Sequence, residues 1–329
     1  MEILNRNADY DVLGIGSALL DLTVTVSDGD LERLGLRKGE MLLIDSERSR
    51  EILASLVDRP MVVTPGGSSA NTLAGIAAMG GRGVFLGKVG NDHHGDRYIR
   101  DTEDAGVKAD IRRHNSLTGH AITFITPDSE RTFATHLGAA LLLNSDDVRE
   151  EDIRRSKIVH VEGYLFEPPG LREASLRSLE IARDNSVLVS IDLSDPGLIE
   201  RIRDTLERVV SDFADIVFAN EDEARAFTGK TRDKALSRIA RQCGFAAVKL
   251  GSEGSIIQSG DSVYVIDVFG TDVVDTNGAG DMYAAGVLYG IARGFDPGHC
   301  GRIGSFVSSR VVSHVGARVQ GIIPVDGIS

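Results

Sequence analysis

Cysteine is scarce in this chain of 329 residues, which contains only Cys243 and Cys300. Two cysteines this far apart have neither the density of a disulfide framework nor the spacing of a metal site, so we expect both to be structural. Stability must then come from a hydrophobic core. With 42% hydrophobic and 26% charged residues, the composition is that of a soluble globular protein that can bury one.

Positive charge is also in short supply, because 36 lysines and arginines face 49 aspartates and glutamates, for a formal net charge of −13. A surface with this balance repels the phosphates of nucleic acids and the headgroups of anionic lipids. We therefore expect no nucleic-acid partner and no membrane partner.

Long apolar segments are missing as well. The longest stretch without a charged residue, residues 61–81, is long enough to cross a bilayer, but it carries Pro65, Gly66 and Gly67 in its interior. It is typical of a strand, a glycine loop and a helix. The first residues, MEILNRNADYD, have neither a basic nor an apolar region of the secretory type, so we expect a cytoplasmic location.

Apolar runs of strand length alternate with amphipathic stretches of helix length along most of the chain. The runs are YDVLGIG, MVVT, GVFLGKVG, KIVHV, VLVSID and DIVFAN, and helices are expected from about residues 70, 94, 172, 198 and 221. Such alternation predicts an α/β fold in which helices cover a parallel sheet. No low-complexity linker divides the chain, so we expect a single domain over residues 1–329.

Two regions break this alternation with short segments of period two, LTVTV in the first and HAITFIT and RTFATHL in the second. They are typical of antiparallel strands outside the main sheet. We expect them, at about residues 18–45 and 115–137, to pair into a small sheet that forms a lid over the larger domain.

The strongest chemical signal is DVVDTNGAGDMYAAGVLYGIA, residues 272–292, in which an apolar-periodic helix follows Gly278, Ala279 and Gly280. These small residues leave the amide hydrogens of a helix N-terminus open to an anion. Asp281 lies in the first turn, where its carboxylate can take a proton from a hydroxyl beside a bound phosphate. The alternative is that Asp275 or Thr276 caps the helix and Asp281 complements its dipole.

Two segments resemble the signatures of the PfkB, or ribokinase-like, carbohydrate kinase family. They are DTNGAGDMYAAG at residues 275–286 and GGSSANTLAGIAAMGGRGVFLGKVGNDHHGD at residues 66–96, and the resemblance extends over about residues 11–316. The runs LGLRKGEMLLID and EGYLFEPPG look most like the adenosine kinase branch. The resemblance implies a ribokinase-like three-layer sandwich with a mainly parallel central sheet and a small β-sheet lid.

The resemblance also assigns roles to individual residues. It implies that Asp281 is the catalytic base, and that the backbone of Asn277, Gly278, Ala279 and Gly280, shaped by Thr276, holds the γ-phosphate. The implied acceptor-binding residues are Ser17, Asp21, Gly66, Gly67 and Asn71. The implied nucleotide-binding residues are Asn220, Glu223, Lys249, Gly251 and Gly254, and Glu223 would assist Mg²⁺ indirectly.

Each of these residues has a plain structural alternative. Asp21 could be a turn residue, Asn71 could cap or pack within its helix, and Glu223 could be a solvated helix residue. Gly251 and Gly254 could be ordinary hairpin glycines. Arg131 could reach the acceptor or the phosphates from the lid, or simply lie on a solvated face.

The implied function is an ATP-dependent phosphotransferase that acts on a primary hydroxyl of a small-molecule acceptor with Mg²⁺. An adenosine-like nucleoside needs an apolar slot, for which the candidates are Met41, Leu43, Phe133, Leu137 and Phe166. Ser17 stands where many adenosine kinases have Asn, so a ribokinase- or fructokinase-type sugar kinase is the competitor. A non-catalytic nucleoside or sugar sensor is a third hypothesis. A K⁺ requirement and a homodimer through the lid both stay open.

Overall fold

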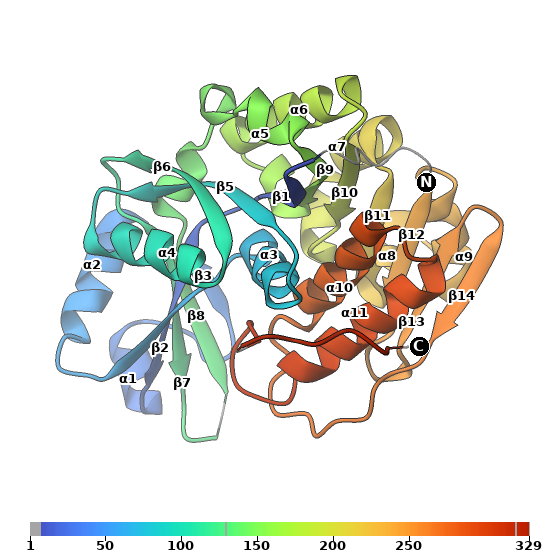
Figure 1. Cartoon of the computed structure of the whole chain (residues 1–329). Coiled ribbons are helices and arrows are strands. Elements are labelled where there is room, and N and C mark those ends of the chain that lie inside the picture. Colours follow the sequence, from blue (N-terminus) through green and yellow to red (C-terminus); the bar gives the residue numbers. More distant parts are fainter. Residues whose placement is uncertain (1–7, 129, 320, 329) are drawn as a thin grey trace.

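Two β-sheets of different size organise the computed structural model, which describes residues 8–128, 130–319 and 321–328 (Figure 1). The larger sheet has the order β14-β13-β12-β11-β10-β9-β1-β5-β6, and only β13 and β14 run antiparallel to their neighbours. Its strands are β1 (Tyr10–Ile15), β5 (Gly83–Gly90), β6 (Val107–His114), β9 (Ser156–Glu162), β10 (Leu188–Asp192), β11 (Ile216–Asn220), β12 (Phe245–Lys249), β13 (Ser255–Ser259) and β14 (Ser262–Ile266).

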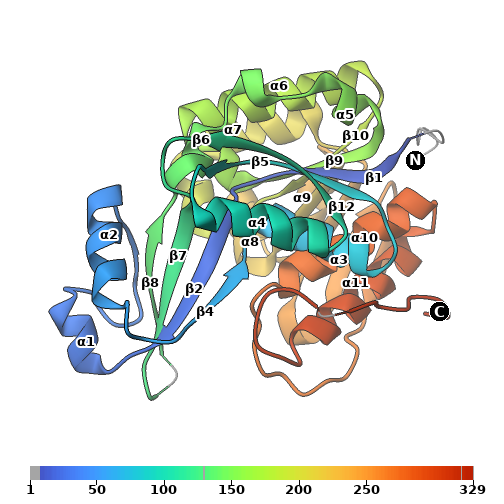
Figure 2. The same cartoon turned by 60° about the vertical axis from the view of Figure 1, so that its left-hand side comes forward.

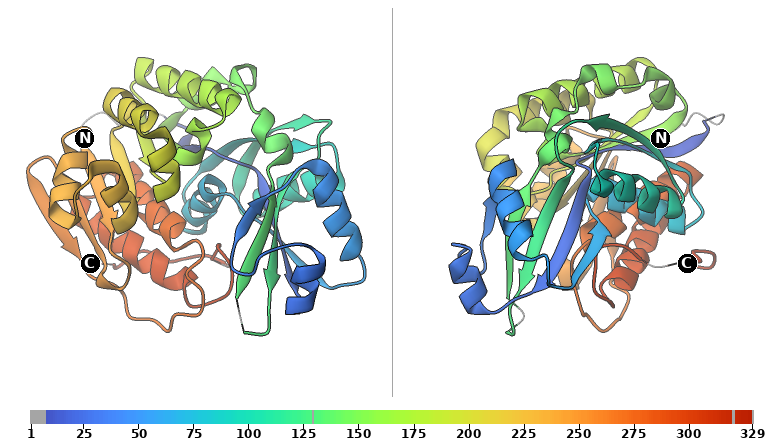
Figure 3. Two further views of the ribbon diagram at one scale, coloured as in Figure 1. Left: turned by 180° about the vertical axis from the view of Figure 1, so that it is seen from behind. Right: turned by 90° about the vertical axis from the view of Figure 1, so that its left-hand side faces the viewer.

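Helices cover both faces of this sheet, and each face has its own apolar core. One face, towards the viewer in Figure 1, carries α3 (Ser68–Ala78), α4 (His93–Asp104), α10 (Ala279–Arg293) and α11 (Pro297–Val311). The other face, seen from behind in the left panel of Figure 3, carries α5 (Glu150–Arg154), α6 (Pro169–Asp184), α7 (Pro196–Phe213), α8 (Glu221–Thr228) and α9 (Arg232–Ala240).

The central strands are buried almost throughout, as β5 and β9 show with nearly every residue inaccessible. Parallel strands covered on both faces need such continuous apolar runs, which is why the apolar runs in the sequence predict these strands. The predicted three-layer α/β fold is confirmed. Among the described residues, no helix is both long enough and apolar enough to cross a membrane.

The smaller sheet has the order β3-β8-β7-β2-β4. Two helices, α1 (Asp28–Arg33) and α2 (Ser46–Ser55), lie against one of its faces (Figure 2), and Leu31 and Ile52 from these helices are buried in the same core as Leu22 and Phe124 of the sheet. Its strands are β2 (Leu19–Thr25), β3 (Met41–Leu43), β4 (Met61–Pro65), β7 (Gly119–Ile125) and β8 (Arg131–His136).

Two expectations about the strands were wrong. The run MVVT is β4, which pairs antiparallel with β2 in the smaller sheet instead of extending the larger one. The smaller sheet is also mixed, since β2 pairs parallel with β7 and β3 pairs parallel with β8. The reason lies in the connections: β2 follows β1 and β7 follows β6, so both leave the same edge of the larger sheet in the same direction.

A buried histidine in β9 makes the stability of the fold depend on pH. His160 is fully buried, its Nδ1 lies 2.9 Å from Ser190 Oγ, and burial lowers the pKa of its ring from 6.5 to about 4. Below pH 6.5 the unfolded chain binds a proton that the folded chain does not, so this residue removes stability as the pH falls towards 4.

We expect the replacement His160→Gln to cost less stability at pH 4.5 than at pH 7, by about 2–3 kcal/mol in the free energy of unfolding. Urea unfolding of both proteins at the two pH values measures this difference, in which contributions from other titrating groups cancel. Equal costs at both pH values would show that folding does not change the pKa of His160.

Candidate active site

Polar side chains gather at the carboxyl edge of the larger sheet, where four neighbouring parallel strands end. Glu162, Asp192, Asn220 and Lys249 are the last residues of β9, β10, β11 and β12. In open α/β sheets ligands bind outside this edge, where the chain order reverses. Here the reversal lies at β1, which pairs with β5 on one side and β9 on the other.

The glycine motif forms the expected helix start. Helix α10 begins at Ala279, and its N-cap residue Gly278 adopts the left-handed φ of 72°, so no side chain caps this helix end. The capping role considered for Asp275 or Thr276 is therefore wrong. Asp275 instead accepts hydrogen bonds from the backbone N–H of Asn277 at 3.0 Å and of Gly316 at 3.1 Å, and it shapes the loop before the helix.

A cavity of about 530 Å³ opens in front of this helix start. Several of the predicted nucleotide-binding residues line it together, namely Lys249, Gly251, Gly254, Thr276, Ala279 and Gly280. Val268, Phe269 and Val273 add an apolar wall from the loop before α10. Gly251 and Gly254 also shape the β12–β13 hairpin with positive φ angles, so their hairpin role and their place at the cavity coexist.

Lys249 brings a cation to the helix start. Its Nζ lies 3.1 Å from Asp192 Oδ2 and 3.0 Å from the position that a Cβ on Gly280 would occupy. Burial by itself lowers the pKa of Lys249, but Asp192 and Glu223 raise it above its ordinary value, so the amine stays charged. We did not predict Asp192. Its signal in the sequence was an acid at the end of the buried run VLVSID.

Asn220 and Glu223 form a reciprocal capping box at the start of α8. The Glu223 carboxylate accepts from Asn220 N at 2.7 Å and from Asn220 Nδ2 at 2.6 Å, while Asn220 Oδ1 accepts from Glu223 N at 2.8 Å. Glu223 is only 4% exposed, so it is not a solvated helix residue. Burial, followed by repulsion from Asp192, raises the pKa of its carboxyl.

Asp281 turns from the first turn of α10 towards α3. Its Oδ1 accepts from Ser68 Oγ at 2.7 Å and its Oδ2 from Asn71 Nδ2 at 2.9 Å. Burial raises the pKa of its carboxyl, and the two hydrogen bonds oppose that rise. The residue as a whole is half-buried. The Asn71 side chain thus binds Asp281 and does not cap its own helix.

Asp21 of the smaller sheet lies beside Gly66. It is an interior residue of β2, paired with Thr64 and Ala121, so it is not a turn residue. A Cβ on Gly66 would stand 2.6 Å from Asp21 Oδ2. Burial raises the pKa of Asp21 to about 6, with Arg318 opposing and Asp281 adding to the rise.

The face of the smaller sheet that carries Asp21 is partly apolar. Residues paired across neighbouring strands point to the same face, so Asp21 shares one row with Leu43, and Phe133 shares the next row with Met41. Met41 and Leu43 are 61% and 60% exposed. Phe166, which we also considered for an apolar slot, is fully buried in the core between the sheet and α6, so that suggestion was wrong.

Glu162 is a further residue that we did not predict. Its two carboxylate oxygens accept from the backbone N–H of Ser17 and of Ser69, both at 3.0 Å. It therefore ties the loop after β1 to the start of α3. Burial raises the pKa of Glu162 to about 7. The acid at the start of EGYLF, at the end of a buried run, was the signal available in the sequence.

Arg131 connects the smaller sheet to the loop before α10. From β8 its Nη1 and Nη2 approach the Asp275 carboxylate at 3.4 and 3.2 Å. Arg131 therefore does not simply lie on a solvated face, because its partner Asp275 is buried in the loop that precedes α10. Arg131 thus reaches the loop before α10 from the smaller sheet.

Comparison with known proteins agrees with this arrangement. Residues 45–322 match the family described as pfkB family carbohydrate kinase. The chain is similar to a probable sugar kinase from Rhizobium etli, with 33% identity, a TM-score of 0.86, and 95% of this chain and 96% of that one covered.

Two adenosine kinases are also similar. The structure from Sinorhizobium meliloti is 34% identical, with a TM-score of 0.84 and 98% of each chain covered. The enzyme from Saccharomyces cerevisiae is 28% identical over 92% of this chain and 94% of its own length.

Proposed function

The chain belongs to the pfkB family of carbohydrate kinases and is a phosphotransferase, and from this premise we propose that it moves the γ-phosphate of ATP to the primary hydroxyl of a nucleoside, with Asp281 as the general base. The observation that carries the proposal is the place of Asp281. It follows directly after the open amide hydrogens at the start of α10. Its carboxylate also accepts hydrogen bonds from Ser68 and Asn71 of α3, the helix that follows Gly66 and Gly67.

On the donor side, ATP binds in the cavity lined by Lys249, Thr276 and Gly280, with its terminal phosphate towards the helix start. The amide hydrogens and the positive end of the helix dipole face that phosphate. The Lys249 ammonium adds a fixed charge to the same place. Fixed donors and charges of this kind stabilise a phosphoryl group in transfer without having to reorganise.

Mg²⁺ fits the acids at this edge. Asp192 and Glu223 are buried beside Lys249 and would hold the ion near the phosphates, with Glu223 kept in place by its hydrogen bonds from Asn220. When bound, Mg²⁺ neutralises charge on the phosphate oxygens.

On the acceptor side, Asp21 accepts hydrogen bonds from vicinal hydroxyls, and the acceptor hydroxyl donates its proton to Asp281. Ser68 and Asn71 hold that carboxylate with both oxygens oriented. The raised pKa of Asp281 makes it a better proton acceptor than a free aspartate. Gly66 and Gly67 let the acceptor loop approach β2 closely.

The exposed Met41 and Leu43 on the Asp21 face favour a nucleoside acceptor. The nucleobase of a nucleoside needs an apolar surface to pack on, whereas a simple sugar needs none. A sugar acceptor is the second candidate, and Ser17 at the acceptor loop supports it. The third candidate, a sensor without catalysis, leaves unexplained why a carboxylate should be oriented beside an anion site.

The test is a coupled assay of ADP release with adenosine, inosine, ribose, fructose and 2-keto-3-deoxygluconate, each with and without K⁺. We expect turnover with adenosine to exceed turnover with the free sugars. Turnover of ribose or fructose alone would establish the sugar kinase, and tight nucleoside binding without ADP release would establish the sensor.

We also propose that the smaller sheet, within about residues 18–45 and 115–137 and with β4 added, is a lid that closes over the acceptor. Replacing Arg131 with Met removes the ion pair to Asp275 and should lower kcat about 10-fold, because the lid then no longer carries a charge to the anion-binding loop. Steady-state kinetics measures this change.

The matched control for Arg131 is Arg113→Met, which removes the ion pair of Arg113 Nη2 with Asp96 at 2.6 Å, far from the loop. Its kcat should match that of the unaltered protein. If the two substitutions had equal effects, the ion pair with Asp275 would have no role in turnover.

A homodimer through the lid and a cytoplasmic location remain predictions. Helices α1 and α2 already cover one face of the smaller sheet (Figure 3, right panel), and a second copy would therefore have to meet its edge strands β3 and β4 or its acceptor face.

A further inference from the structure

We propose that Arg318 is the residue that positions the acceptor site, because it fixes the orientation of the Asn71 amide and, through it, the Asp281 carboxylate. Arg318 follows α11 in a segment far from every sequence motif discussed above. The inference rests on the proposed function, since it assigns Asp281 to the reaction. It adds a residue beyond α11 to Asp21, Asn71 and Asp281.

The hydrogen bonds form an unbroken relay. Arg318 Nε donates to Asn71 Oδ1 at 2.8 Å, Asn71 Nδ2 donates to Asp281 Oδ2 at 2.9 Å, and Ser68 Oγ donates to the other carboxylate oxygen at 2.7 Å. A guanidinium can only donate and a carboxylate can only accept. The amide between them can therefore take one orientation only, because a flip would set its NH₂ group against Arg318 and its oxygen against Asp281.

Charge supports the same role. Arg318 lies close enough to Asp21 and Asp281 to lower the pKa of Asp21 and to have its own pKa affected by both acids, although burial is the main influence and lowers the pKa of Arg318. Two partly buried carboxylates that face one acceptor repel each other. The guanidinium attracts both carboxylates and so favours the ionised form of each, which Asp21 needs to bind hydroxyls and Asp281 needs to take a proton.

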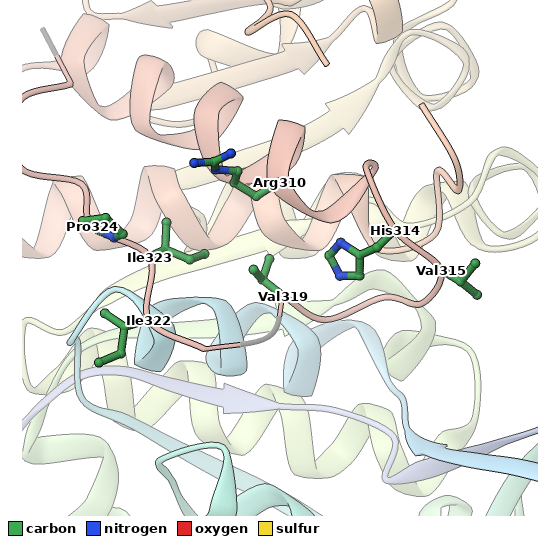
Figure 4. A pocket seen from close by; sticks show the side chains of 7 residues that line it. All are labelled: Arg310, His314, Val315, Val319, Ile322, Ile323 and Pro324. Atoms are coloured by element: carbon green, nitrogen blue, oxygen red, sulfur yellow. The ribbon is translucent and has the colours of Figure 1, made fainter. Parts of the chain in front are cut away.

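The segment that carries Arg318 is anchored on both sides. Ile323 N donates to the carbonyl of Ala78 at the end of α3, and Arg318 O lies 3.1 Å from His314 Nε2. Figure 4 shows this segment running alongside α11, with Val319 and Ile323 turned towards that helix; Ile323 is buried and Val319 is partly buried in the same core. This anchoring holds the guanidinium at a fixed place against Asn71.

Tyr98 is a second neighbour of the guanidinium besides Asn71. Its ring is fully buried, and Arg318 and Tyr98 lie close enough for each to affect the pKa of the other. The Arg318 Nη2 is buried and has no hydrogen-bond partner among the residues that the structure describes. Arg318 therefore belongs to one buried cluster with Asn71, Tyr98 and the two acids.

The first test is a double-mutant cycle with Arg318→Gln and Asn71→Ala. We expect Arg318→Gln to lower kcat/KM for the acceptor about 100-fold, with KM for ATP unchanged, since a catalytic group displaced by about 1 Å loses this much. In the double variant the loss should be clearly smaller than the product of the two single losses, because the hydrogen-bond part of the Arg318 effect passes through Asn71. Fully additive losses would overturn the relay.

The matched control is Arg310→Gln. Arg310 lies in α11 only eight residues before Arg318, but its guanidinium stacks on the Phe306 ring at 5.0 Å and takes no part in the site. This variant should retain the kcat/KM of the unaltered protein. Thermal unfolding of all variants identifies any that fail to fold, and the lysine substitution Arg318→Lys serves as a second variant.

A second measurement does not depend on turnover. Carboxyl ¹³C NMR titration should show the pKa of Asp21 and of Asp281 rising in Arg318→Gln and unchanged in Arg310→Gln. Unchanged pKa values in Arg318→Gln would refute the electrostatic role. If the unaltered protein released no ADP with any acceptor, the proposed function would fall, whereas the titration would still decide whether Arg318 controls the two acids.

Discussion

Replacing Asp281 with Asn should lower kcat by about 10²- to 10⁴-fold, the usual contribution of a general base, while the affinity for ATP stays nearly unchanged. Asn keeps the shape of the side chain but cannot take the proton of the acceptor hydroxyl. ATP affinity should persist because Lys249, Thr276 and Gly280 line the nucleotide cavity and Asp281 does not. The coupled assay gives kcat, and titration calorimetry with ATP gives the affinity.

The dependence of kcat on pH provides a second readout for Asp281. Burial raises the pKa of its carboxyl above the ordinary value, so the activity of the unaltered protein should fall as the pH drops through this raised pKa and the base becomes protonated. The residual activity of Asp281→Asn should lack that acidic limb.

The control for the same chemical change is Asp296→Asn. Asp296 caps α11 by accepting from His299 N at 3.0 Å, and Asn caps helices equally well, so kcat should not change. If Asp281→Asn retained kcat within a few-fold, then the proton would leave by another route and the assignment of the base would be wrong.

The sequence was informative wherever one local pattern determines one local structure. Buried parallel strands need continuous apolar runs, so DIVFAN and VLVSID predicted β11 and β10. The Gly278 motif predicted a helix start with open amide hydrogens, with a cap by Asp275 or Thr276 as the alternative, and the structure has no side-chain cap there. These features depend on residues close to one another in the chain.

The sequence was less informative wherever the structure depends on contacts between distant segments. The run MVVT predicts a strand but not the sheet to which the strand belongs. Its place in the smaller sheet follows only from the direction in which the chain leaves the larger sheet. Glu162, Asp192 and Arg318 lie 145, 57 and 247 residues from the groups they bind. A single sequence contains no spacing that reveals such pairs.

Gly278 is the position where a single methyl group should disturb both halves of the site. Its φ of 72° is costly for any other residue, and a Cβ there would stand 2.3 Å from the carbonyl oxygen and 2.7 Å from the Cα of Ala317. Backbone atoms this close have to move. Either the helix start shifts, or the segment that carries Arg318 does.

We therefore expect Gly278→Ala to lower kcat/KM for ATP about 10²- to 10³-fold, as the loss of one backbone donor does in comparable anion sites. Gly229→Ala is the matched control, since Gly229 has a similar φ of 68° at the end of α8 but no atom within 4 Å of an added Cβ. The control should lose stability without losing turnover. Equal loss of turnover in both variants would mean that backbone strain, rather than the geometry of the helix start, lowers the rate, and the anion site would have to be sought elsewhere along the cavity.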